Sequence, residues 1–356
     1  MSRLRELFDQ HGQSPWLDNL RRGWISSGEL QVLIDRGVRG ITSNPSIFQK
    51  AMTGTDDYDE QLSALAGAGR SIEDSYWELV TRDIVDALDL LRPVHKATDG
   101  LDGFVSVEVD PSLAADTGGT EAAARHLSRI IDRPNLFVKI PATTEGIPAI
   151  RTMIGEGCSV NVTLIFSLNR YEDVMEAYIA GLEAHEGDLS GTSSVASFFI
   201  SRTDTEIDRR LDAVGTPEAL ALRGRAAVAQ GQVAYDLFRR AFSGPRWEAL
   251  VARGARVQRP LWASTSTKNP AYPDTLYVDA LIGPDTVNTL PEATLEAFDE
   301  HGTLARTVDA DPEGARATLA AVEAAGIDLD DVSRVLEEEG VGAFVKSFDE
   351  LLDTLG

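Results

Sequence analysis

The chain has 356 residues, of which 43% are hydrophobic and 25% are charged, as in an ordinary globular protein that folds around its own core. Its formal net charge of -24 disfavours nucleic acids and acidic membrane surfaces as partners, because both are negatively charged. The single cysteine, Cys158, excludes an internal disulfide. The N-terminal residues carry charges at short intervals, so we expect neither a signal peptide nor a membrane span, and a cytoplasmic protein.

Short β-like runs alternate with amphipathic helical patterns along most of the chain. The predicted strands cover residues 15–20, 37–43, 103–109, 136–140, 159–166, 194–200, 260–264 and 286–289. The clearest predicted helices cover residues 27–34, 121–131, 145–154, 169–182 and 203–242. Eight strands separated by helices favour an α/β fold with a single (β/α)8 TIM barrel domain over residues 1–356, although a doubly wound sheet alternates in the same way.

Two helical segments exceed what a minimal barrel needs. Residues 49–102 follow the second strand and include a helical pattern over 72–91, which predicts extra helices on that connection. The chain after residue 290 is also helical and ends in an amphipathic pattern that contains Phe344 and Phe348. This last helix is expected to close the barrel floor or to cross to a second subunit, so the sequence is compatible with a monomer or a homodimer.

Lys139 lies inside the apolar run LFVKIPAT at residues 136–143. A cation within such a strand is costly to desolvate unless it is paired or neutral, and burial favours the neutral amine. A neutral amine is a nucleophile towards carbonyl groups, which is how Schiff-base lysines work. Taken alone, the lysine could instead lie on an exposed strand face or extend its amine to the edge of the core.

Other polar residues stand at the ends of the predicted strands, where a barrel of this kind carries its reactive side chains. They are Asp18, Asn44, Glu108, Asn161, Thr163, Ser197, Arg202, Ser264 and Lys268. Several have a structural interpretation when taken singly: Asp18 and Asn44 suit caps or turns, and Arg202 could pair with Glu206 along a helix. Together with Lys139 they predict a site with perturbed pKa values at one end of the barrel.

Four segments carry a resemblance to a known family. GITSNPSIF at residues 40–48 resembles the first transaldolase signature, and VKIPAT at 138–143, followed by EGI at 145–147, resembles the active-site lysine signature. NVTLIFS at 161–167 and WAS at 262–264 are similar to further segments of that family. The likeness runs from Asp18 to about Pro291 and favours the longer bacterial branch of monofunctional transaldolases.

The resemblance implies a barrel of the class I aldolase type that uses no metal and no organic cofactor. It implies transfer of a dihydroxyacetone unit between sugar phosphates in the pentose phosphate pathway. Sedoheptulose 7-phosphate and glyceraldehyde 3-phosphate would give erythrose 4-phosphate and fructose 6-phosphate.

Residue roles follow from the resemblance position by position. Lys139 matches the Schiff-base lysine and Asp18 the base that takes the C4 hydroxyl proton, while Glu108 and Thr163 match the pair that holds a water and shuttles protons. The remaining matches concern substrate binding: Asn44 and Asn161 for the dihydroxyacetone hydroxyls, Ser197 and Phe199 for the pocket wall, and Arg202 for the phosphate.

The chain departs from the family pattern after Ser264. Many members continue with an aromatic residue and a second phosphate-binding arginine, whereas this chain reads TSTK at residues 265–268. We hypothesise that Lys268 binds the phosphate as a point charge and that Ser264 or Ser266 adds a hydroxyl.

Two other functions remain open at this point. A fructose-6-phosphate aldolase on the same scaffold would cleave the sugar without an acceptor, although Glu108 favours transfer. A catalytically silent sugar-phosphate binding protein would need no buried amine. The five histidines show no metal-ligand spacing, so no metal site is expected.

Overall fold

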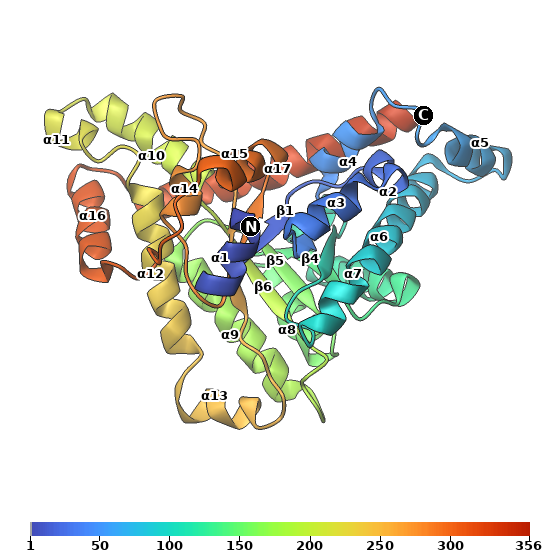
Figure 1. The fold of residues 1–356 in the computed structure, drawn as a ribbon, viewed down its shortest axis with the longest axis horizontal. Helices are drawn as coiled ribbons and strands as arrows, with labels where there is room; N and C mark the ends of the chain where they lie inside the picture. The colour runs from blue at the N-terminus through green and yellow to red at the C-terminus, as the bar shows by residue number, and fades with distance from the viewer. Residues whose placement is uncertain (1) are drawn as a thin grey trace.

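A computed structural model describes residues 2–356, in which eight parallel strands close into a barrel in sequence order (Figure 1). The strands are β1 (Gln13–Leu17), β2 (Gly40–Ile41), β3 (Phe104–Glu108), β4 (Leu136–Pro141), β5 (Val160–Ile165), β6 (Ser194–Phe199), β7 (Arg259–Ala263) and β8 (Thr286–Leu290). The predicted (β/α)8 barrel is therefore confirmed, together with the extra helices after the second strand and at the C-terminal end.

Helices surround the barrel and decorate both of those regions. In the first half of the chain they are α1 (Arg3–His11), α2 (Arg22–Ser27), α3 (Glu29–Arg36), α4 (Pro45–Met52), α5 (Asp59–Gly67), α6 (Ile72–Ala97), the 3-10 helix η1 (Pro111–Ala115), α7 (Thr117–Ile131) and α8 (Gly146–Gly155). The later helices are α9 (Leu168–Ala184), α10 (Ser201–Val214), α11 (Pro217–Leu220), α12 (Ala226–Ala241), α13 (Gly244–Val251), α14 (Leu276–Asp279), α15 (Glu292–His301), α16 (Pro312–Ala324) and α17 (Leu329–Leu355).

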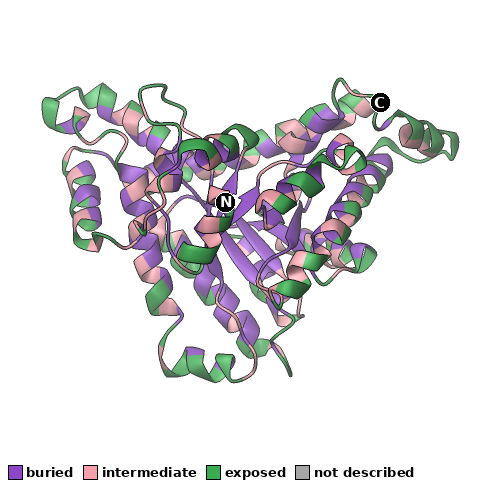
Figure 2. Cartoon of the chain, viewed as in Figure 1, coloured by how far each residue is buried: buried purple, intermediate pink, exposed green. Residues whose placement is uncertain are grey.

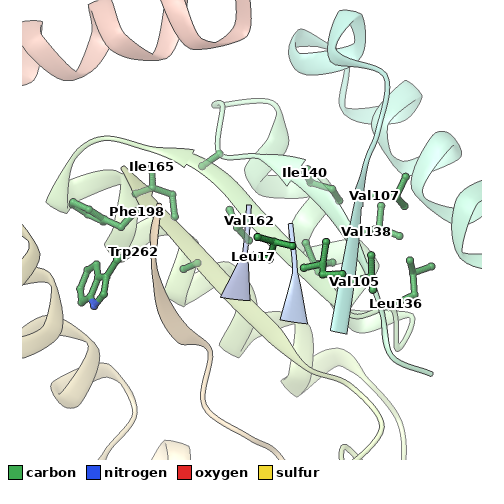
Figure 3. Packing of buried hydrophobic residues seen from close by; sticks show 14 of the residues in the cluster. Leu17, Val105, Val107, Leu136, Val138, Ile140, Val162, Ile165, Phe198 and Trp262 are labelled. Carbon is green, nitrogen blue, oxygen red and sulfur yellow. The ribbon is translucent and has the colours of Figure 1, made fainter. Parts of the chain in front are cut away.

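Alternate residues of each strand face opposite sides of the barrel wall. Most of the outward residues are aliphatic or aromatic and form the large core beneath the helices, as Figure 3 shows for Val105, Val138, Val162, Phe198 and Trp262. Every residue of the eight strands is buried, whereas most surrounding helices expose one side (Figure 2). Burial on both faces explains why the strands read as nearly continuous apolar runs.

The inward residues form layers that change in polarity along the barrel axis. At the floor, the carboxylate of Asp102 accepts hydrogen bonds from Arg39 and Arg259 at 2.8 and 2.9 Å. Above this ion cluster lies an aromatic layer, in which Phe104 and Phe137 stack with ring centroids 4.1 Å apart. In most strands or just beyond their ends, polar side chains follow two residues later, as Lys139 follows Phe137. The floor is closed by the ion cluster and the aromatic layer, so the opposite mouth is the open end of the barrel.

The boundaries that differ from the sequence predictions include those of the first two strands and of one long helix. Strand β1 ends at Leu17, so Asp18 begins the loop at the mouth; β2 is reduced to Gly40–Ile41. The helix predicted over 203–242 is wrong as one element: it breaks at Gly215, whose φ of 72° caps α10, and at the Pro217 that opens α11. The apolar pattern continues across the break because α10 and α11 pack on the same core.

The C-terminal helix α17 lies across the mouth of the barrel beside α4, so the prediction that it closes the floor is wrong (Figure 1). Its Ser347 and Glu350 side chains hydrogen-bond to Ser46 and Gln49 of α4 at 2.6 and 2.8 Å. Gly340 permits the close approach, because a Cβ there would lie 3.0 Å from the Leu164 side chain of β5. The helix is thus part of the wall around the mouth.

Candidate active site

Lys139 and Glu108 form a buried ion pair at the mouth. The two residues are direct neighbours in the β3–β4 register. Lys139 Nζ donates to Glu108 Oε2 at 3.0 Å and to the carbonyl oxygen of Ser43 at 3.2 Å. Their exposed fractions are only 4% and 6%, so the pair compensates two charges that would be costly to bury singly.

Burial raises the pKa of the Glu108 carboxyl, although the charge and hydrogen bond of Lys139 act in the opposite direction. The charge of Asp18 adds to the rise. A carboxyl with a raised pKa, in contact with an amine, is suited to exchange protons with it. The geometry therefore places an amine and its proton acceptor in one contact.

Asp18 stands on the other side of the mouth within an ordered chain of hydroxyls. Thr42 Oγ1 donates to Asp18 Oδ1 at 2.7 Å, and with its one proton used there it accepts from Thr289 Oγ1 at 2.6 Å. Burial raises the pKa of Asp18, while the Thr42 hydrogen bond and the charges of Lys139 and Arg202 lower it. Asp18 is therefore a second candidate for proton exchange.

The two asparagines occupy different depths. Asn44 caps α4 through Oδ1, which accepts from Ile47 N at 3.0 Å, and its side chain lines the cavity. Asn161, adjacent to Lys139 in the register, lies fully buried just beneath. Its amide donates to Ser106 Oγ at 2.9 Å, and its Oδ1 accepts from Ser197 Oγ at 2.7 Å. Asn161 therefore orients Ser197, which reaches the cavity surface.

Thr163 presents a buried hydroxyl with no hydrogen-bond partner among the described residues. It lies where the β5–β6 register shifts, between Val162 and Ile165. The next residue, Leu164, has a φ of 60°, which is rare for a side chain of that size. Such bulges redirect side chains next to functional sites, and this one leaves Thr163 Oγ1 free at the cavity wall.

A cavity of about 360 Å³ collects these groups at the C-terminal ends of the strands. Of the residues expected from the sequence, its wall includes Asp18, Asn44, Lys139, Thr163, Ser197, Phe199, Arg202, Ser264 and Lys268. Glu108 and Asn161 contact wall residues from behind. Ser266, the alternative to Ser264 in the sequence analysis, also lines the cavity. Sequence reasoning missed Thr42, Ser46, Lys50, Thr289 and Phe344, which line it too.

Phe344 comes from α17, far from any strand end. Its ring is 3% exposed and lies over the Nζ of Lys139, 5.5 Å from nitrogen to ring centroid. A cation above an aromatic face is stabilised electrostatically, more strongly where water is excluded. The apolar positions of the last helix were visible in the sequence. The sequence did not show which surface of the barrel they cover.

Cations gather at the outer part of the cavity. Arg202, the second residue of α10, lies over Phe199, with 5.4 Å between the guanidinium carbon and the ring centroid. Lys268 Nζ donates to Ser266 Oγ at 2.8 Å. Ser264, held at a φ of 55°, hydrogen-bonds to Ser201 at 2.8 Å and so joins the strand-β7 loop to α10. Cations and hydroxyls of this kind recognise oxyanions such as phosphate.

Residues 2–356 show neither of two other classes of site. No three His, Cys, Asp or Glu side chains there come together as metal ligands. None of the helices described combines the length and apolar character needed to cross a membrane. The polar and charged residues expected from the sequence meet instead in the cavity at the barrel mouth.

Comparisons with known proteins agree with the geometry. The family described as Transaldolase/Fructose-6-phosphate aldolase matches residues 15–355. "Transaldolase" of Thermobifida fusca (strain YX) is 54% identical over 357 residues, covering 99% of this chain and 97% of that protein. "Transaldolase 2" of Streptomyces avermitilis is 55% identical over 348 residues, covering 96% and 94%. "Transaldolase" of Parafrankia sp. (strain EAN1pec) is 53% identical over 349 residues, covering 97% and 95%.

Proposed function

Because the chain belongs to the transaldolase/fructose-6-phosphate aldolase family, we propose that it is a transaldolase of the pentose phosphate pathway. It transfers a dihydroxyacetone unit from sedoheptulose 7-phosphate to glyceraldehyde 3-phosphate, which yields erythrose 4-phosphate and fructose 6-phosphate. The observation that carries the proposal is the contact between Lys139 Nζ and Glu108 Oε2 at the barrel mouth.

The first step joins the donor ketose to the enzyme. The Lys139 amine, after passing a proton to Glu108, attacks the C2 carbonyl carbon and forms a C–N bond. Glu108 then returns a proton to the C2 hydroxyl, which leaves as water, and a protonated Schiff base remains. The unpartnered Thr163 hydroxyl is suited to hold that water.

The second step breaks the bond between C3 and C4. Asp18 removes the C4 hydroxyl proton, the aldehyde forms at C4, and the electron pair of the broken bond moves into the Schiff base. The product on the lysine is an enamine of dihydroxyacetone. The hydrogen-bond chain from Thr289 through Thr42 keeps the Asp18 carboxylate oriented for this proton transfer.

Transfer reverses these events with a second aldehyde. The enamine carbon C3 attacks the acceptor aldehyde carbon, and Asp18 returns its proton to the new hydroxyl. Water then adds to the Schiff base, and departure of the amine releases the ketose product. Asn44, together with Ser197 held by Asn161, is suited to bind the dihydroxyacetone hydroxyls, which fixes the three-carbon unit while the aldehydes exchange.

The phosphate end of the sugar is assigned to the outer cations. Arg202 offers a planar donor fork, and Lys268 with Ser264 and Ser266 adds a point charge and hydroxyls. Lys268→Met is expected to raise the Michaelis constant for phosphorylated substrates.

Chemical trapping tests the proposal directly. Incubation with fructose 6-phosphate and borohydride should reduce the Schiff base and attach a three-carbon adduct to the peptide that contains Lys139. Lys346, an exposed lysine on α17, provides an internal control that should remain unmodified. Absence of the adduct, or an adduct on another lysine, would contradict the mechanism, and a silent binding protein would show no label.

Acceptor dependence distinguishes transfer from simple cleavage. A transaldolase turns over fructose 6-phosphate steadily only when an acceptor such as erythrose 4-phosphate is present. Continuous release of free dihydroxyacetone without an acceptor would identify the aldolase alternative. We further infer that residues 1–356 act as one domain, since the last helix supplies Phe344 to the site; the cytoplasmic location and the oligomeric state remain predictions.

A further inference from the structure

We propose that Lys50 of α4 is a third phosphate-binding cation of this site and determines its preference for phosphorylated sugars. This inference rests on the proposed function. It concerns a residue that belongs to none of the strand ends, and it assigns α4 a role at both ends of the substrate.

The helical period directs Lys50 into the cavity. Ser46, Ile47 and Lys50 all line it, and their spacing of three and four residues places them on one face of α4. Phe48 and Met52 are buried on the opposite side of the helix. Lys50 thus shares a helix face with residues whose position in the wall is fixed.

No carboxylate forms a direct ion pair with this group of cations. Within residues 2–356, neither Lys50, Arg202 nor Lys268 has an acidic oxygen within 4.0 Å, although the chain has a net charge of -24 and most of its arginines are paired. Burial, followed by the charges of Arg202 and Lys50, lowers the pKa of Lys268, and the charge of Asp18 opposes this shift. Cations that repel one another and have no carboxylate in direct contact favour a bound oxyanion, and a phosphate dianion relieves this repulsion.

Helix α4 also has a suitable length. Its N-cap, Asn44, lies at the inner part of the site, and Lys50 follows six residues later, a rise of about 9 Å along the axis. That distance is comparable with the separation between the three-carbon end and the phosphate of an extended sugar phosphate. The bonds from α17 to Ser46 and Gln49 fix α4 in place, so both contacts depend on one rigid element.

Kinetics with Lys50→Met test the inference, with Lys96→Met as the matched control. Lys96 is an exposed lysine near the end of α6, so its removal changes the net charge equally without touching the site. Lys50→Met should raise KM for fructose 6-phosphate about tenfold, the usual range for loss of one charge-assisted contact. The affinity for inorganic phosphate, measured by calorimetry, should fall by a similar factor. Lys96→Met should change neither value.

A substrate without phosphate separates recognition from chemistry. The rate at which dihydroxyacetone and borohydride label Lys139 should stay within twofold in Lys50→Met. Unchanged KM and phosphate affinity would overturn the role of Lys50, and so would a labelling rate that falls as much as phosphate affinity does. Failure of the unmutated protein to label at Lys139 would instead overturn the proposed function, and the specificity role with it, even if phosphate bound normally.

Discussion

The ring of Phe344 lies over the Nζ of Lys139, with 5.5 Å between the nitrogen and the ring centroid. The two residues come from the last helix and the fourth strand, and Gly340 brings that helix close enough for the contact. A positively charged nitrogen, whether ammonium or protonated Schiff base, gains from the aromatic face and from the exclusion of water. Phe344 is therefore a positioning residue for the lysine chemistry.

Replacement of Phe344 should slow the reaction without removing it. We expect Phe344→Leu to lower kcat about two- to thirtyfold, corresponding to roughly 0.5–2 kcal/mol of lost cation–π stabilisation. Leucine retains much of the apolar volume, so KM for fructose 6-phosphate and the thermal midpoint should change little. A kcat equal to that of the unmutated protein would show that the ring only fills space.

The hydrogen bond from Thr42 should tune the pH dependence of catalysis. Cleavage needs Asp18 as a carboxylate, so activity should fall as the pH decreases through the Asp18 pKa. The Thr42 bond lowers this pKa, and its removal in Thr42→Val should raise it and shift the acid limb of kcat/KM to higher pH. Thr354→Val, at an exposed position of α17, should leave the limb in place. A shift to lower pH would contradict the assignment.

Asp18→Asn should separate Schiff-base formation from bond cleavage. Lys139 and Glu108 remain paired in this variant, so fructose 6-phosphate and borohydride should still label Lys139, now with the whole six-carbon sugar. Release of glyceraldehyde 3-phosphate should fall by roughly 10²-fold or more, the usual contribution of a general base. A three-carbon adduct formed at the normal rate would assign the base to another residue.

Asp204 should make stability depend on pH. Burial raises its pKa to about 6 from the ordinary value of 3.8, although its oxygens accept from Ala227 N and Tyr277 Oη. Between pH 3.8 and about pH 6 the folded chain binds more protons than the unfolded chain. The free energy of unfolding therefore falls as the pH rises through this range. The full loss is about 3 kcal/mol above pH 7.

Asp204→Asn removes this dependence. Relative to the unmutated protein, the variant should therefore gain up to about 3 kcal/mol of unfolding free energy between pH 4 and pH 7. Denaturant unfolding at both pH values measures the difference. If the difference in unfolding free energy between the two proteins is the same at pH 4 and at pH 7, Asp204 is excluded as the titrating group.

The sequence was sufficient to predict the barrel and the strand-end residues for a physical reason. Parallel strands end at one mouth, so polar residues at the ends of different strands, such as Lys139 and Glu108, must meet there. Lys50 and Phe344 escaped prediction because both lie on helices outside the repeating unit. Their place depends on how α4 and α17 pack, which no local pattern specifies. The break at Gly215 was predictable, since glycine followed by Thr216-Pro217 is a common way to end a helix and begin the next.

The position of α17 in the chain also determines when its contact with Lys139 can form during synthesis. A ribosome completes all eight strands, and with them Lys139, before it adds the helix that carries Phe344. A nascent barrel therefore lacks the aromatic ring over Lys139 until α17 emerges and packs on the mouth. The part of the reactivity that depends on Phe344 is acquired only after all eight strands have been made.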